Sequence, residues 1–155
     1  MKLRFEQIVA APREALFAFH STPANLAALL EGWSGFALLA HDGHIRPGSR
    51  VRLEQRVVGM RHTMEFAHFV LEPPQRFGER QIRGPFRRFE HVHEFFEAAQ
   101  GTRVIDTVEF ELPWHLGGAL ADRWIAAPVL TRFFEFRRSA YQRLCEARRF
   151  EVRAP

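Results

Sequence analysis

The segment 36–112 alternates apolar and polar side chains almost without interruption, and this pattern constrains the fold more than any other feature. A period of two places successive side chains on opposite faces of a β-strand. Turn residues such as Asp42-Gly43, Pro47-Gly48, Gly59 and Gly84-Pro85 divide the segment into short strands. Strands joined by short turns form an antiparallel meander with one face available for burial.

Helices are expected before and after this meander in the sequence. The first strand is predicted over 2–9, and two short helices are predicted over 12–19 and 22–30. Beyond Pro113, apolar residues recur at helical intervals over about thirty residues, which predicts a long C-terminal helix. Pro128 lies inside this stretch and is expected to kink or divide the helix. The expected apolar positions are Leu116, Leu120, Trp124, Leu130, Phe134, Tyr141 and Leu144.

The length and composition favour one α+β domain. The chain has 155 residues, of which 46% are hydrophobic, and we expect a single domain over 1–150 with a tail over 151–155. Sixteen Phe and three Trp against one Tyr supply bulky apolar surface with few polar groups. This composition favours a large core or an apolar cavity.

The charge pattern argues against two classes of partner. The formal net charge is +4, but the Arg residues are dispersed along the chain, whereas nucleic-acid binding needs a concentrated basic stripe. No apolar run reaches the roughly 18 residues that span a bilayer, so integral membrane association is not expected. The basic residues of the last helix are interpreted as an exposed face that complements the helix dipole: Arg137, Arg138, Arg143, Arg148 and Arg149.

The cysteine content indicates the cellular compartment. Cys145 is the only cysteine, so no intramolecular disulfide can form, and a reducing cytoplasm is expected. The sequence leaves a monomer and a homodimer open.

The order of elements, together with several short phrases, resembles a known superfamily. The phrases are Gly84-Pro85-Phe86, then His-Val-His-Glu-Phe from residue 91, and Asp-Thr-Val-Glu-Phe-Glu-Leu-Pro from residue 106, leading to Leu116-Gly117-Gly118. They resemble the START-like (SRPBCC) superfamily, in which a curved sheet of about six or seven strands wraps a long C-terminal helix, the helix-grip fold. The resemblance to its polyketide cyclase/dehydrase-like members implies a deep cavity for hydrophobic ligands. It implies no particular reaction, because one scaffold hosts many functions.

Three polar residues could carry chemistry at this cavity. His91 and His93 share one face of a strand, a spacing at which two imidazoles can bind one metal ion. Two histidines do not make a site, so no metal and no cofactor are expected, although His62 or His68 could add a third ligand. Asp106 lies on an apolar face of the next strand and should find His91, His93 or an Arg as its donor. That contact is either a structural ion pair or an acid/base pair.

The cavity wall is expected to combine apolar side chains with a few polar ones that orient a ligand. The expected ligand-binding residues are Gln55, Met64, Phe66, His68, Phe77, Gln81, Phe89, His91, His93, Asp106, Val108, Phe110, Leu120, Trp124 and Phe134.

Three functions remain open from the sequence. The chain binds or carries a small hydrophobic ligand such as a lipid, an aromatic compound or a polyketide-like compound. Alternatively, it is a cyclase/dehydratase-like enzyme that uses His91, His93 and Asp106 as acid/base groups without a redox cofactor. A third alternative is a protein-interaction module whose cavity is filled by side chains.

Overall fold

The computed structural model describes residues 1–57 and 60–150, which contain one seven-stranded antiparallel sheet. The strand order is β1-β7-β6-β5-β4-β3-β2, so the meander continues from β2 to β7 and β1 pairs with β7. The strands are β1 (Lys2–Val9), β2 (Ala37–His41), β3 (Arg50–Val57), β4 (Met60–Glu72), β5 (Arg76–Arg83), β6 (Arg88–Ala98) and β7 (Gly101–Glu111). This arrangement confirms the helix-grip fold.

The helices lie at the two predicted positions. After β1 come α1 (Arg13–His20), the 3-10 turn η1 (Pro23–Asn25) and α2 (Leu26–Leu29). After β7 come η2 (Trp114–Leu116), α3 (Gly118–Ala121), the π-helical turn η3 (Asp122–Ala126) and the 20-residue α4 (Ala127–Glu146). The segments α3, η3 and α4 follow one another without a break, so Pro128 lies inside a continuous helical run and cannot donate to a carbonyl of the preceding π-helical turn. The irregular geometry therefore precedes the proline.

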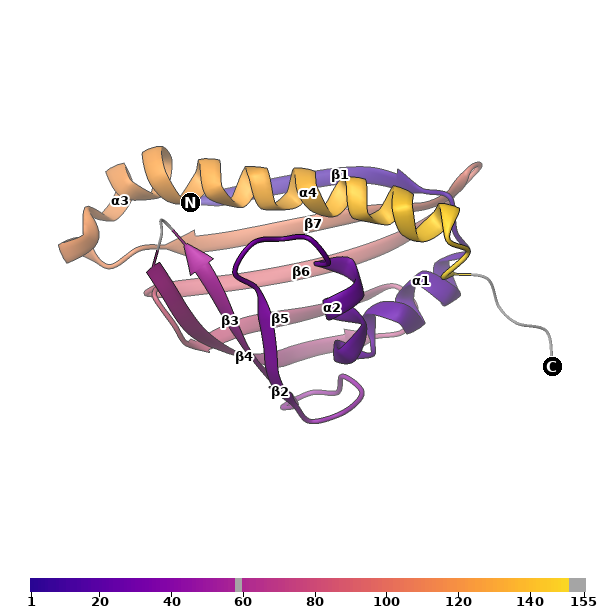
Figure 1. Cartoon of the computed structure of the whole chain (residues 1–155), viewed down its shortest axis with the longest axis horizontal. Helices are drawn as coiled ribbons and strands as arrows, with labels where there is room; N and C mark the ends of the chain where they lie inside the picture. Colours follow the sequence, from indigo (N-terminus) through magenta and orange to yellow (C-terminus); the bar gives the residue numbers. More distant parts are fainter. Residues whose placement is uncertain (58–59, 151–155) are drawn as a thin grey trace.

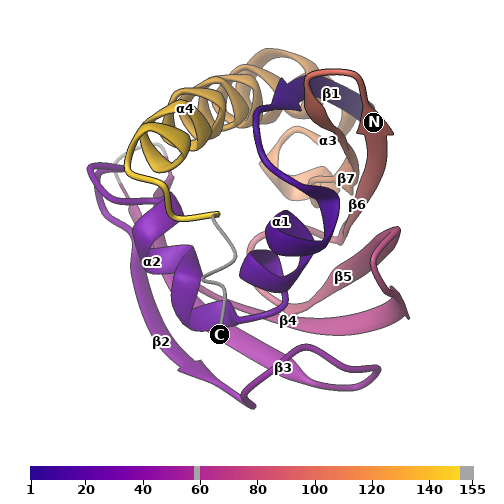
Figure 2. The ribbon, with the colours of Figure 1, turned by 90° about the vertical axis from the view of Figure 1, so that its right-hand side faces the viewer.

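The sheet and the last helix together enclose an interior. Figure 1 shows α4 running along the sheet over β1 and β7. In the end-on view of Figure 2 the sheet curls through most of a ring, and α4 crosses the side that the strands leave open. The short helix α1 lies inside this ring at the end nearer the viewer. The elements thus form a barrel-like shell with one end plugged by α1.

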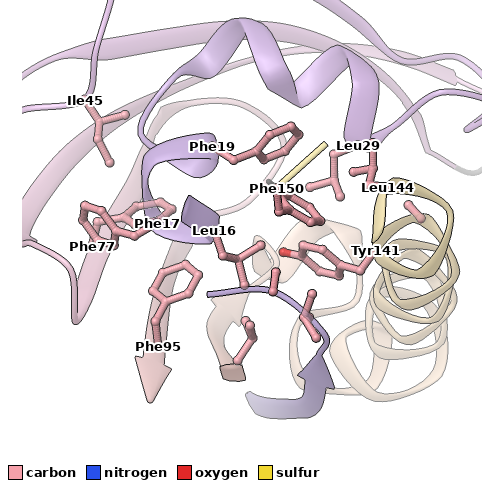
Figure 3. Close-up of a cluster of buried hydrophobic side chains, with 14 residues drawn as sticks. Leu16, Phe17, Phe19, Leu29, Ile45, Phe77, Phe95, Tyr141, Leu144 and Phe150 are labelled. Carbon is pink, nitrogen blue, oxygen red and sulfur yellow. The ribbon is translucent and has the colours of Figure 1, made fainter. Parts of the chain in front are cut away.

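Two separate apolar clusters hold the shell together. The first joins α1, α2 and α4 to the sheet and contains the fully buried Leu16 and the almost fully buried Tyr141 (Figure 3). The second lies at the other end of α4 and includes Phe134, which stacks on Phe5 of β1 at a centroid distance of 4.2 Å. Because the helix is anchored at both ends, the space between the anchors need not be filled.

Some expectations cannot be compared with this structure. The turn expected at Gly59 and the tail expected over 151–155 lie outside the described residues. Among the described helices, none has the length and apolar character needed to cross a membrane.

The first cluster generates a stability prediction. Leu16→Ala should lower the free energy of unfolding by about 2–5 kcal/mol, because it leaves a cavity in a fully packed position. Leu120→Ala is the matched control, since that side chain is 72% exposed and its loss should change stability by about 0.5 kcal/mol or less. Urea unfolding followed by circular dichroism measures both, and equal effects would contradict this assignment of the core.

Candidate functional site

A cavity of about 370 Å³ lies between the inner face of the sheet and α4. It has the size of a site for a small organic molecule, and most of its lining is apolar. Side chains therefore do not fill the interior, which removes the basis for an interaction module with a filled cavity.

Nine of the fifteen residues expected to bind ligand line this cavity: Gln55, Met64, Phe66, His68, Phe77, Phe89, His91, His93 and Phe134. Asp106, Val108 and Phe110 are buried but lie outside the lining. Gln81 also lies outside it, where its amide donates a hydrogen bond to the carbonyl of Phe86 at 2.8 Å.

Leu120 and Trp124 depart most from the expectation, because they are exposed to solvent. Their side chains are 72% and 70% exposed, and neither belongs to the cavity lining. The cause is the π-helical turn at 122–126, because its wider winding shifts the face that the preceding residues present. The four-residue steps from Leu116 through Leu120 to Trp124 are therefore out of phase with the buried face of α4, and they assign these two side chains to the wrong face.

The sheet register brings five polar residues to one end of the cavity. Across β4, β5 and β6, Glu79 is paired with both His68 and His91. One row further along, His93 of β6 is paired with Asp106 of β7. Because side chains alternate along each strand, all five residues project from the inner face toward α4. We call this group, together with Arg137, the polar cluster.

Asp106 is the centre of the polar cluster. Its Oδ1 atom lies 2.9 Å from His91 Nε2, 2.7 Å from His93 Nδ1 and 3.7 Å from Arg137 Nη1. The His91 contact is a hydrogen bond, whereas His93 Nδ1 is close but poorly aligned and has no hydrogen-bond partner. Burial alone would raise the pKa of Asp106, but the charge of Arg137 and the two histidines hold it well below its usual range. Asp106 is therefore a buried carboxylate ion.

Arg137 is buried, which corrects its assignment to an exposed basic face. Only 4% of it is accessible, because the spacing Phe134, Arg137, Tyr141 places it on the buried stripe of α4. Its Nη2 donates to the Tyr141 hydroxyl at 3.1 Å, and that hydroxyl lies 2.7 Å from His20 Nε2. Burial, together with repulsion from Arg137, lowers the pKa of His20, so its neutral Nε2 accepts a hydrogen bond from the Tyr141 hydroxyl.

Glu79 was not among the expected site residues, yet it lines the cavity beside three histidines. Its Oε1 lies 3.5 Å from His91 Nδ1 and its Oε2 lies 3.9 Å from His68 Nε2. Although burial raises the pKa of Glu79, contact with His91 and the other histidines lowers it to about 2. The alternation Phe77, Glu79, Gln81 along β5 was the sequence signal that placed it inward.

The two neighbouring imidazoles have divergent proton affinities. Burial and the positive charge of His91 lower the pKa of His93 to about 4. Burial also acts on His91, but its contacts with Asp106 and Glu79 outweigh that effect and raise its pKa. One imidazole that holds a proton beside one that releases it could act as an acid/base pair toward a molecule in the cavity.

A family model described as polyketide cyclase/dehydrase and lipid transport matches residues 9–133 of the chain. No curated protein matches the chain in sequence.

Solved structures of diverse origin share this fold at low sequence identity. A Thermus thermophilus protein is 20% identical with a TM-score of 0.74, over 95% of this chain and 99% of its own. The Zhui aromatase/cyclase of a Streptomyces species is 19% identical with a TM-score of 0.60, over 73% of this chain and 68% of its own. A major latex-like protein from Panax ginseng is 13% identical with a TM-score of 0.69, over 97% of this chain and 98% of its own.

The burial of Arg137 generates a second stability prediction. Arg137→Leu should lower the free energy of unfolding by about 3–5 kcal/mol, since it leaves the carboxylate of Asp106 buried without its cation. Arg132→Leu, at an exposed position of the same helix, is the matched control and should change stability by about 0.5 kcal/mol or less. The measurement is urea unfolding at neutral pH, and a loss below about 1 kcal/mol for Arg137→Leu would show that the ion pair is unimportant.

Proposed function

Because the chain belongs to the polyketide cyclase/dehydrase and lipid transport family, we propose that it binds a small hydrophobic molecule between the sheet and α4. The observation that carries the proposal is the cavity of about 370 Å³, whose lining is largely apolar. The apolar lining favours a lipid-like, aromatic or polyketide-like body over a sugar or a nucleotide.

The polar cluster refines the class of ligand. It forms one end of an otherwise apolar cavity and offers imidazole groups, a carboxylate and a guanidinium. A ligand with an apolar body and one oxygen-bearing end matches this distribution, because its polar end would find partners inside the protein. We therefore favour a molecule that carries a hydroxyl or carbonyl group.

The other end of the cavity offers a route of entry. Met60, Leu116 and Ile125 line the cavity and are also 62%, 50% and 48% exposed. Exposed apolar side chains at a cavity mouth are suited to transfer of an apolar molecule, since they lower the cost of its passage from water. We propose that the ligand enters between these residues.

For the chain as a whole we propose a monomer or homodimer that acts in the cytoplasm without nucleic acid. The free thiol of Cys145 is compatible with a reducing compartment.

Filling the cavity should weaken ligand binding. Leu130→Trp adds bulk at a lining position of α4, and we expect the affinity for a fluorescent fatty-acid analogue to fall at least about tenfold. The measurement is fluorescence titration, supported by native mass spectrometry of freshly purified protein.

Leu120→Trp is the matched control, because it makes the same change on an exposed residue of the preceding helix. Met64→Trp fills the cavity from the sheet and serves as the second test. If both cavity variants fold and bind the probe as tightly as the unmodified protein does, the ligand lies elsewhere.

A cyclase or dehydratase activity is the second candidate, and one observation favours it. His91 and His93 face the cavity, while the Asp106 carboxylate behind them contacts both rings. In a dehydration, an imidazole removes a proton next to the carbonyl and a protonated imidazole protonates the departing hydroxyl. A carbon–carbon double bond forms as the carbon–hydrogen and carbon–oxygen bonds break, and water leaves.

An aromatic β-hydroxy ketone is a direct substrate for testing this chemistry, because its dehydration product absorbs in the near ultraviolet. We expect His91→Gln to lower the dehydration rate at least about a hundredfold, the usual contribution of one general acid or base. Binding of the fluorescent analogue should persist. His115→Gln, on the exposed turn η2, is the control. Equal rates for both variants would remove the enzymatic alternative.

A further inference from the structure

We propose that Glu79, His91 and His93 bind a divalent first-row transition-metal ion at the end of the cavity. One ligand atom from each residue can be chosen so that all three atoms lie within 4.8 Å of one another. Two imidazoles and one carboxylate suit ions such as Zn²⁺, Mn²⁺ or Fe²⁺, which accept nitrogen and oxygen ligands together. This inference stands apart from the identity of the hydrophobic ligand.

The hydrogen bond of His91 fixes which of its nitrogens would meet the ion. Asp106 is ionised and can only accept, so His91 Nε2 must carry the hydrogen of their 2.9 Å bond. In the neutral ring this leaves a lone pair on Nδ1, which lies 3.5 Å from the carboxylate oxygen of Glu79. In that state two acceptors face each other, and either a proton on Nδ1 or a metal ion between them would satisfy both.

His68 repeats this arrangement on the other side of Glu79. Its Nδ1 lies 3.1 Å from both the carbonyl oxygen and the hydroxyl of Ser49, and because that hydroxyl donates its hydrogen to the carbonyl of Arg46 at 2.8 Å, Nδ1 carries the hydrogen. The lone pair of the neutral ring is then on Nε2, which lies 3.9 Å from Glu79 Oε2. His68 is thus a possible fourth ligand, and its ring is oriented as metal-ligating histidines are, by an acceptor on the opposite nitrogen.

His93 contributes a second, independent indication. It is buried to 4% exposure, its ring centroid lies 3.8 Å from that of His91, and its Nδ1 lies 2.7 Å from Asp106 Oδ1 without the alignment of a hydrogen bond. A buried ring nitrogen without a partner is costly, and a role as metal ligand would account for its placement.

The charges of the polar cluster also admit a cation. Glu79 and Asp106 contribute two negative charges, while Arg137 contributes one positive charge at 3.7 Å from Asp106. The remaining negative charge is compensated either by a proton on His91, whose pKa is raised, or by a metal ion that takes the place of that proton. These two possibilities make different predictions for metal content.

The geometry also indicates what such an ion would face. Glu79, His91 and His93 all line the cavity, so coordination positions that the protein does not fill would open toward it. Sites that hold their metal with three protein ligands keep such a position for water or substrate. The matching ligand class is a hydrophobic molecule with a carbonyl, enol or hydroxyl oxygen.

The test uses full-length protein without a histidine tag, stripped with a chelator and titrated with Co²⁺ and Zn²⁺. We expect about one equivalent of Zn²⁺, a visible cobalt spectrum, and a melting temperature about 5–10 °C higher at a hundredfold excess over the dissociation constant. Glu79→Gln and His93→Gln should each weaken binding at least about a hundredfold.

His62→Gln is the matched control, because His62 also lines the cavity but is paired with Gln55, away from the polar cluster. Circular dichroism establishes that each variant is folded. The metal content of the unmodified protein tests the proposal without any variant. Binding of less than about a tenth of an equivalent would overturn the proposal and leave a proton as the compensating charge. Tight binding that both ligand substitutions leave unchanged would overturn it as well. Neither result bears on binding of the fluorescent fatty-acid analogue, which tests the hydrophobic site separately.

Discussion

The buried carboxylate of Asp106 is the constraint on which the interior depends. An ion at 2% exposure needs compensation from within the protein, and Asp106 obtains it from His91, His93 and Arg137. The two histidines come from the adjacent strand, whereas the arginine comes from α4. One electrostatic requirement thus couples the sheet to the helix that closes it. A change in the position of α4 would separate Arg137 from Asp106, so the helix position and the charge state of the polar cluster depend on each other.

The cavity persists because α4 is held at its two ends rather than along its whole length. Phe134 and Ala127 anchor its first half on β1 and β7, while Tyr141 and Leu144 anchor its second half on α1 and the neighbouring strands. Arg137 lies between these anchors, where its guanidinium also lies 5.1 Å above the ring of Phe134. A side chain that must keep polar partners cannot collapse into the space beside it. The polar cluster therefore helps to keep the interior open.

A period of two is a local property of the chain, so it can be read from the sequence. It predicted the sheet, the side chains that face inward, and the residues with which Asp106 could pair. The same rule placed Glu79 between Phe77 and Gln81, but a lone acidic residue gives no sign of its neighbours until the strand register is known. The stripe of α4 could likewise have placed Arg137 inside, although an arginine among other arginines is usually exposed. Leu120 and Trp124 were placed on the wrong face, because Pro128 indicates an irregular helix but not that the irregularity is a π-helical turn over 122–126.

The polar cluster is difficult to explain by stability alone. Buried ion pairs are often replaceable by apolar residues without loss, since desolvation cancels much of their attraction. Phe77, Phe134 and Phe89 already surround the cavity, and further side chains of that kind would close this end more simply. Instead the chain places two carboxylates, three imidazoles and a guanidinium where an apolar ligand would end, with two imidazole nitrogens directed at one carboxylate. Such an arrangement is useful when the end wall must hold a proton, a metal ion or the polar end of a guest. The physical cost of the cluster is thus the strongest argument that this part of the cavity has a function.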